Sequence, residues 1–461
     1  MDPSTSQTPS PPTAVVEPRF LDAVETLPRP QLRALQEQRL LRMLRYAYER
    51  SALLRNNWQA AGVRPDDIRS IDDFKRLAPF TDKDQIRAFR DEHDDPFGGL
   101  LCIPPEEISF IASSSGTTGD PTLFTWRWGS SDGMDPQCPG IEAGTSNFWP
   151  NTPRDLWQMG VRAGDYVVLL ANRIRGPVFR VLERLGTIPI LLSYHPDDTH
   201  AFVEMSRRYR PAVLFTASNP FIYQLELLER DHGVDMREVF TSYKAVMFAG
   251  EPMGPRNRRL LEGWGLIGRI YNQTAFGDIA VAHECREHEG MHAHEDFALV
   301  ELVDPQTGAL IEGDGVGELC VTSLINDVDP LIRYRSGDMI RLTTEPCACG
   351  RSSARFWTVG RSGDEVVVDG RTVLPMDVWA AVENVDDTSA GLFQVIRTGR
   401  HMPALRMRVG YGGTPDLAAV QAQLVESVQR AVGLIAEIEL VPYSELLKIG
   451  PRNKIPRTAK Q

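Results

Sequence analysis

The hydrophobic pattern between residues 160 and 250 alternates short apolar runs with longer polar segments. Four apolar runs are expected to form buried strands: 166–170, 188–192, 212–215 and 245–248. The intervening segments 197–210 and 220–231 have compositions compatible with helices. This alternation predicts parallel strands with crossover helices. Sheets of this kind bind ligands beyond the carboxyl ends of their strands. The turn at 249–252 is therefore expected to face a ligand.

Other parts of the chain follow different patterns. Apolar residues between Leu40 and Arg50 are spaced for one face of an amphipathic helix. Residues 296–345 contain short apolar runs separated by turn residues, which predicts antiparallel strands. A tail of about 100 residues after Gly360 has strand, helix and strand patterns. The first 18 residues are rich in proline, serine and threonine, and they are expected to be disordered.

Length and charge narrow the classes of function. A chain of 461 residues is too long for one core, so two or three domains are expected. A net charge of −12 argues against nucleic acid as a partner, because phosphate backbones select basic surfaces. No apolar run reaches the roughly 18–20 residues of a membrane helix, so no membrane partner is expected. Six cysteines do not indicate a disulfide scaffold, and a cytoplasmic location is the simplest expectation.

The segment 113–122, Ser-Ser-Ser-Gly-Thr-Thr-Gly-Asp-Pro-Thr, concentrates hydroxyls and glycines behind an apolar lead-in. Its backbone N–H groups and hydroxyls could surround a phosphate, and its glycines would allow close approach. The alternative is a flexible surface loop, since such compositions are common in loops. The segment lacks the Gly-Lys-Ser/Thr of a Walker loop, so a phosphate site here would need a cation from elsewhere.

Further segments, taken in order, resemble the adenylate-forming superfamily of acyl-CoA synthetases, adenylation domains and luciferases. They are 271–274 (Tyr-Asn-Gln-Thr), 334–338 (Tyr-Arg-Ser-Gly-Asp), 360–364 (Gly-Arg-Ser-Gly-Asp) and 451–457 (Pro-Arg-Asn-Lys-Ile-Pro-Arg). The match is closest to the phenylacetate–CoA ligase branch, which also shows segments like 46–51, 77–83 and the Cys-x-Cys-Gly-Arg at 347–351. The resemblance runs from about residue 30 to the end.

The resemblance implies a fold and a reaction. The fold is α/β, with a large N-terminal domain of mixed or parallel sheets over 19–360 that includes a small β-subdomain at about 296–345. A small, mobile α+β lid domain follows over 361–461. The reaction would join a small aromatic carboxylic acid to ATP as acyl-AMP, release pyrophosphate, and pass the acyl group to coenzyme A, with Mg²⁺ as a cofactor. The sequence leaves open whether the chain acts alone or as a homodimer.

The resemblance also assigns residues to the nucleotide. The phosphates would contact Ser114, Ser115, Gly116, Thr117, Thr118 and Gly119; the adenine would lie near Gly250, Glu251 and Pro252 and the turn Tyr271, Asn272, Gln273 and Thr274. Asp338 would bind the ribose hydroxyls, Arg361 would lie at the hinge beside the nucleotide, and Lys454 would be the catalytic cation. Without the resemblance, Asp338 is a turn aspartate and Lys454 a solvated terminal charge.

Three positions depart from the family pattern. Ala275 stands where the family has a Mg²⁺-binding glutamate, with Asp278 close by as a substitute. Gly363 replaces the hinge acid, and Asp120 replaces a lysine. These differences keep three alternatives open: transfer of the activated acyl group to an amine with release of AMP, adenylation of an acid other than a carboxylic acid, and a catalytically silent nucleotide-binding homologue.

A metal site and an acid pocket complete the candidates. Some members of the branch carry a structural zinc, and the matching residues here are Cys285, His292, Cys347 and Cys349, with His288 as a rival ligand. The alternative is a set of buried thiols and surface histidines. Aromatic residues near the expected strand ends, Tyr194, His195, Phe248 and Phe276, would suit a planar acid, although core packing explains each equally well.

Overall fold

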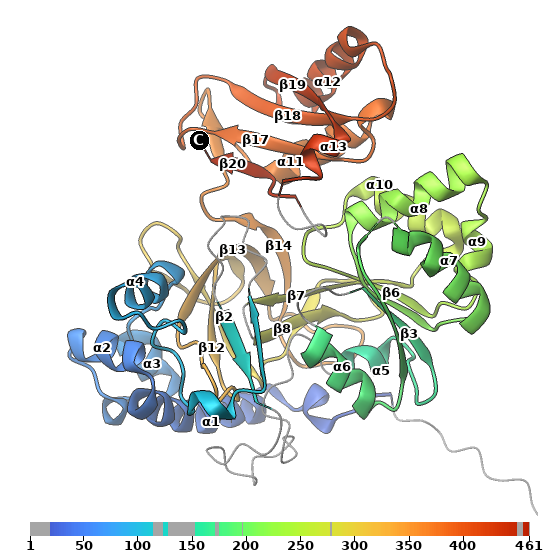
Figure 1. The fold of residues 1–461 in the computed structure, drawn as a ribbon. Helices are drawn as coiled ribbons and strands as arrows, with labels where there is room; N and C mark the ends of the chain where they lie inside the picture. The colour runs from blue at the N-terminus through green and yellow to red at the C-terminus, as the bar shows by residue number, and fades with distance from the viewer. Residues whose placement is uncertain are drawn as a thin grey trace, which may run out of the picture.

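The computed structural model of the protein describes residues 19–113, 123–127, 153–170, 175–195, 197–276, 279–449 and 455–460. Its largest sheet has twelve strands among these residues, in the order β11-β10-β12-β13-β14-β9-β8-β7-β6-β5-β3-β4. Helices cover this sheet, and a separate C-terminal body with its own sheet lies beyond one edge of it (Figure 1). The predicted α/β class is confirmed.

The parallel half of the large sheet is the part that the hydrophobic pattern predicted. Its strands are β3 (Tyr166–Leu170), β4 (Ile188–Leu192), β5 (Val213–Ala217), β6 (Ala245–Ala249) and β7 (Ile270–Phe276). The connecting helices are α6 (Arg175–Arg184), α7 (Asp197–Tyr209), α8 (Asn219–His232), α9 (Met236–Val239) and α10 (Pro255–Leu261), which continues into η4 (Glu262–Leu266). Every residue of β5 is buried, as expected for a central strand covered on both faces.

The antiparallel half joins the parallel half directly, because β7 pairs with β8 in the antiparallel sense. Its strands are β8 (Ile279–Glu284), β9 (Met291–Ala293), β10 (Ala298–Val303), β11 (Leu310–Ile311), β12 (Gly315–Ser323), β13 (Tyr334–Thr343) and β14 (Arg355–Arg361). The antiparallel strands expected in 296–345 are therefore present, and they belong to the same continuous sheet as the parallel strands.

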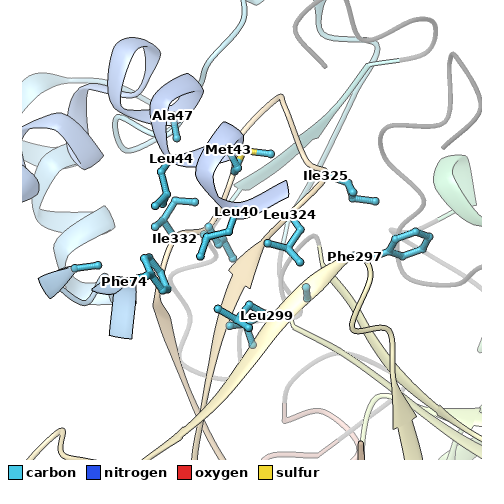
Figure 2. Packing of buried hydrophobic residues seen from close by; sticks show 14 of the residues in the cluster. Leu40, Met43, Leu44, Ala47, Phe74, Phe297, Leu299, Leu324, Ile325 and Ile332 are labelled. Atoms are coloured by element: carbon cyan, nitrogen blue, oxygen red, sulfur yellow. The ribbon is translucent and has the colours of Figure 1, made fainter. Parts of the chain in front are cut away.

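The N-terminal helices pack against the antiparallel half. They are η1 (Ala23–Thr26), α1 (Arg29–Arg50), α2 (Ala52–Ala60), η2 (Pro65–Asp67), α3 (Ile71–Leu77), α4 (Lys83–His93) and η3 (Pro105–Glu107). Figure 2 shows Leu40, Met43 and Leu44 of α1 facing Leu299 of β10 and the nearby Leu324. The helix predicted over 40–50 is confirmed, and it begins earlier, at Arg29. Two further strands, β1 (Phe110–Ser113) and β2 (Leu123–Trp126), form a hairpin, and α5 (Pro153–Gln158) precedes β3.

The C-terminal body combines two small sheets with helices. Its strands are β15 (Val366–Val368), β16 (Arg371–Val373), β17 (Phe393–Arg397), β18 (Leu405–Tyr411), β19 (Ala436–Pro442) and β20 (Thr458–Lys460). Its helices are α11 (Pro375–Glu383), η5 (Asp386–Thr388), α12 (Leu417–Val432) and α13 (Tyr443–Leu446). Trp379, Phe393 and Leu424 belong to a core of its own. No helix in the described part of the chain is long and apolar enough to cross a membrane.

Candidate functional site

The turn after β6 lies at the carboxyl edge of the parallel half, where the sequence predicted a ligand. Ala249, the last residue of β6, is in register with Gln273 of β7, and Gly250 then turns the chain with a φ of +97°. A φ in this region favours glycine. The Asn219 side chain fixes the turn from α8, because it donates to the Pro252 carbonyl at 3.0 Å and accepts from the Gly254 N–H at 3.1 Å.

Glu251 in this turn is held by the C-terminal body. Its carboxylate lies 3.2 Å from the Arg457 guanidinium, and the two side chains are 6% and 10% exposed. Arg457 also lies over the Trp379 ring, 3.7 Å from its centroid, and donates to the Gly391 carbonyl at 2.5 Å. Burial lowers the pKa of Arg457, against the opposing effect of Glu251. The sequence placed Glu251 beside adenine and did not predict this partner.

A second contact joins the two bodies close by. The Glu383 carboxylate of α11 accepts from the Arg256 N–H at 2.6 Å and from the Trp379 indole at 2.8 Å. Burial raises the pKa of Glu383. A Cβ added to Gly254 would lie 1.9 Å from a Glu383 oxygen, so this approach of the bodies requires glycine at 254. The C-terminal body thus packs against the same loop that the sequence assigned to adenine.

Residues 271–274 form part of β7, so the prediction of a turn at Tyr271–Gln273 was wrong. Pairing with β6 on one side and β8 on the other holds this segment extended. Tyr271 is buried, and Asn272 is fixed by Glu284, which accepts from the Asn272 N–H at 2.8 Å and from its side-chain amide at 2.9 Å. Gln273 is also buried, while Thr274 is half-buried.

Asp338 and Arg361 are register partners on β13 and β14. The Arg361 Nε lies 3.5 Å from an Asp338 oxygen, and the Asp338 side chain keeps 24% of its surface exposed. A carboxylate held this way can still accept hydrogen bonds from a diol. The chain leaves β14 at Arg361, and Asp364 then pairs with Lys460 at 3.5 Å. The short segment 362–364 therefore connects the large sheet to the C-terminal body.

The residues predicted to line the acid pocket lie in different surroundings. Tyr194 and Phe248 lie in the core beneath α7 and α8, where the Tyr194 hydroxyl donates to the Thr216 carbonyl at 2.5 Å. His195 is half-buried, and Phe276 ends β7 with a side chain outside the described ones. Ser114 to Gly119, Asp278 and Lys454 also lie outside the described residues. The strands that flank the first of these segments pair from Phe110↔Trp126 to Ser113↔Leu123.

The four predicted metal ligands do meet. Cys285, His292, Cys347 and Cys349 are buried, and their ligand atoms lie within 4.8 Å of one another. The Cys285 and Cys347 sulfurs are 3.8 Å apart, which is about the edge of a tetrahedron with zinc–sulfur bonds of about 2.3 Å. The His292 Nε2 lies 3.3 Å from the Cys349 sulfur, while its Nδ1 contacts the Ser353 hydroxyl. This contact orients the ring, as a hydrogen bond to the other ring nitrogen does for histidines that bind metals.

The electrostatics of the cluster favour a thiolate at Cys349. Hydrogen bonding with Cys285 and then with His292 lowers the pKa of the Cys349 thiol, and thiolates are the form that binds zinc. The rival ligand His288 points elsewhere, since its ring contacts Glu284 at 3.5 Å and the Gly268 carbonyl at 3.2 Å. His292 is therefore the histidine of this Cys₃His cluster.

Comparison with known proteins identifies the family. No family model matches the chain. The phenylacetate–coenzyme A ligase of Thermus thermophilus is 31% identical over 423 residues, which cover 89% of this chain and 85% of that protein. The phenylacetate–coenzyme A ligase of Aromatoleum evansii is 28% identical over 463 residues, which cover 96% of this chain and 98% of that protein.

A solved structure shows the same fold. The crystal structure of 2-hydroxyisobutyryl-CoA ligase in the postadenylation state has a TM-score of 0.80 at 23% identity, and the match covers 99% of this chain and 95% of that one. The open conformation of that enzyme scores 0.66. The chain, at 31% identity to a relative that it matches nearly end to end, belongs to the phenylacetate–CoA ligase family and is an adenylate-forming acid–CoA ligase.

Proposed function

We propose that this ligase activates a small aromatic carboxylic acid, of the phenylacetate type, with ATP and transfers it to coenzyme A. The observation that carries the proposal is the near full-length similarity to two phenylacetate–CoA ligases from different organisms. A carboxylate oxygen of the acid attacks the α-phosphorus, and pyrophosphate leaves. The thiol of coenzyme A then attacks the acyl carbon, AMP leaves, and the thiol proton passes to solvent.

Roles for individual residues follow from positioning and charge. Asp338 binds the ribose hydroxyls, and its contact with Arg361 positions the carboxylate that accepts them. Ser114 to Gly119 hold the phosphates, and Mg²⁺ offsets their charge. Gly250, Glu251 and Pro252 border the adenine, with Asn272, Gln273 and Thr274 behind them. The acid is proposed to lie among Tyr194, His195, Phe248 and Phe276. Of these, Tyr194 and Phe248 belong to the core beneath α7 and α8.

Lys454 is proposed as the cation that stabilises the transition state of adenylation. It lies three residues before Arg457, which is docked on Glu251. We propose that the C-terminal body, residues 361–461, is a lid that turns about 361–364 for the thioester step. The higher TM-score to a postadenylation structure than to an open one agrees with a docked lid here.

The Cys₃His cluster is proposed to hold a structural zinc. Four protein ligands would fill the tetrahedral coordination of the ion and leave no position for a substrate. The site would join the segment after β8 to the loop between β13 and β14, which lies 62 residues away along the chain. Such a link stabilises the fold by restricting the unfolded chain.

The test is mass spectrometry and pyrophosphate release after incubation with ATP, Mg²⁺ and a panel of acids. The panel contains phenylacetate, benzoate, 2-hydroxyisobutyrate and hexanoate, each with and without coenzyme A. We expect acyl-AMP without coenzyme A, thioester with it, and the fastest turnover for an aromatic acid. Turnover of only the aliphatic acids would overturn the aromatic assignment, and amine-dependent but not thiol-dependent consumption of acyl-AMP would overturn the transfer step.

A further inference from the structure

A second buried cluster lies beside the Cys₃His cluster and is made of Asp155, His283 and His294. Asp155 comes from α5, His283 from β8, and His294 follows β9. The residues are 0%, 2% and 4% exposed. One Asp155 oxygen lies 2.9 Å from the His283 Nδ1 and 3.2 Å from the His294 Nε2, and these two nitrogens are themselves 3.2 Å apart. Three ligand atoms from three elements therefore form a nearly equilateral triangle.

Hydrogen bonding alone cannot satisfy all three sides of this triangle. If both nitrogens carry protons for the carboxylate, two N–H groups face each other at 3.2 Å. If only one nitrogen is protonated, the lone pair of the other faces the Asp155 oxygen at close range. If neither is protonated, three lone pairs converge. With Asp155 ionised, every protonation state of the two imidazoles leaves at least one unfavourable contact in this buried site, where such contacts are costly.

A metal cation satisfies all three atoms at once. Ligands about 2.1 Å from a metal are about 3.0 Å apart at an octahedral angle and about 3.4 Å apart at a tetrahedral angle. The observed separations of 2.9, 3.2 and 3.2 Å are close to these ligand–ligand distances. We propose that Asp155, His283 and His294 bind a divalent first-row transition-metal cation, in a site distinct from the Cys₃His cluster.

The surroundings of the triangle fit a partly open site. A cavity of about 20 Å³ is bordered by His283 and His294, and this volume is enough for about one water molecule as a further ligand. The His283 Nε2, on the far side of the ring, is buried with no hydrogen-bond partner among the described residues, so a water there would also satisfy it. Two arginines also border the cavity, and each is paired: Arg154 contacts Asp296 at 2.9 and 3.2 Å, and Arg351 contacts Glu25 at 2.7 Å.

The two clusters share one face of the β8–β9 ribbon. His283 and His292 are directly opposite each other in register, so their side chains lie on the same face. Cys285 directly follows β8 and His294 directly follows β9, so each cluster takes one residue from inside the ribbon and one from just beyond it. The donor sets nevertheless differ: three sulfurs and one imidazole select zinc, whereas two imidazoles and one carboxylate accept Zn²⁺, Fe²⁺, Co²⁺ or Mn²⁺. The second site would tie α5 to the ribbon.

Cobalt titration of the metal-free full-length protein tests the proposal, because the two sites give different spectra. Cobalt bound to thiolates has an intense sulfur-to-metal charge-transfer band, whereas cobalt on nitrogen and oxygen has only weak visible bands. We expect the wild type to bind two equivalents, with the charge-transfer band produced by one of them. The Asp155→Asn/His294→Gln variant should bind one equivalent and keep the band, and Cys347→Ser/Cys349→Ser should bind one and lose it.

A matched control removes a different pair of neighbouring histidines. The His200 and His232 rings lie 5.6 Å apart on the surface, and His200→Gln/His232→Gln should still bind two equivalents. Binding of a single equivalent by the wild type would overturn the proposal, as would two equivalents in Asp155→Asn/His294→Gln. If that variant fails to fold, the wild-type stoichiometry together with Cys347→Ser/Cys349→Ser decides the question, since binding of no cobalt by the variant without Cys347 and Cys349 would overturn the proposal.

Discussion

The Arg457 guanidinium lies 3.2 Å from the Glu251 carboxylate, and this buried ion pair links the C-terminal body to the turn after β6. Both residues belong to segments that resemble nucleotide-site motifs. The pair therefore helps to fix the position of the C-terminal body relative to the carboxyl edge of the parallel strands. Removing two charges from water is costly, and the pair is favourable only while both partners stay in place. The stacking of Arg457 on Trp379 makes the C-terminal partner rigid.

Replacing Arg457 with methionine is expected to lower the free energy of unfolding by about 3 kcal/mol, because a buried Glu251 charge would lose its partner. Urea unfolding measures this change. A double-mutant cycle with Glu251→Gln should show coupling, since the two residues touch. The matched control is Arg406→Met, because the pair of Arg406 with Glu437 is exposed. This substitution should change the free energy of unfolding by less than about 0.5 kcal/mol. Equal effects at the two positions would contradict a specific role for the buried pair.

Lys454→Ala is expected to slow adenylate formation by about 10²–10³-fold, the loss typical of one preorganised donor at a transition state. ATP–pyrophosphate exchange with the best acid of the panel measures this step alone. Lys448→Ala is the matched control, because Lys448 is exposed and lies six residues earlier in the same tail. A Lys454→Ala rate within twofold of the wild type would end the assignment.

The sequence predicted the parallel half of the fold well because its signals are local. Strands such as β3 and β6 are short apolar runs between polar helices, and burial on both faces leaves few other structures for such runs. The Cys₃His cluster was also predictable, through a family pattern of spacing. The turn predicted at Tyr271–Gln273 was wrong because the pairing of Asn272 with Glu284 is a contact between strands, which no local pattern shows.

The second metal cluster and the contacts between bodies were missed for the same reason. Asp155 lies 128 residues before His283 in the chain, and only the folded sheet brings them together. One signal was present: His283 and Cys285, like His292 and His294, alternate along strands and so project from one face. Glu383 and Arg457 carried no comparable signal, because each acts across the junction between two bodies.

The thiolate cluster gives a prediction about stability. Cys347→Ser/Cys349→Ser is expected to lose one equivalent of zinc and to unfold at lower temperature, because bound metal contributes directly to the stability of the folded state. Metal analysis and thermal unfolding of protein purified without chelator measure both effects. Cys102→Ala is the matched control, since Cys102 is a buried thiol far along the chain from the cluster. Unchanged zinc content in the double variant would reject the site.

Asp364, at the junction between the large sheet and the C-terminal body, gives a prediction about pH. Burial raises its pKa above the ordinary value of 3.8. The folded protein therefore holds this proton at pH values where the unfolded chain has already lost it. Stability must then fall as pH rises from about 3.8 through the folded pKa, by linkage. Asp364→Asn cannot ionise, so its stability relative to the wild type should rise across this window, as measured by urea unfolding at a series of pH values.

A control of opposite sign makes the test specific. The Asp314 carboxylate accepts hydrogen bonds from Thr343 and Thr344, and the first of these lowers its pKa below 3.8. Its contribution to stability is present above pH 3.8 and is lost as pH falls through the folded pKa, so Asp314→Asn should lose stability relative to the wild type as pH rises. Lys460, the partner of Asp364, is 54% exposed and stays hydrated in Asp364→Asn. Curves for Asp364→Asn and wild type that run parallel from pH 4 upward would show that Asp364 ionises in the folded protein as readily as in the unfolded chain.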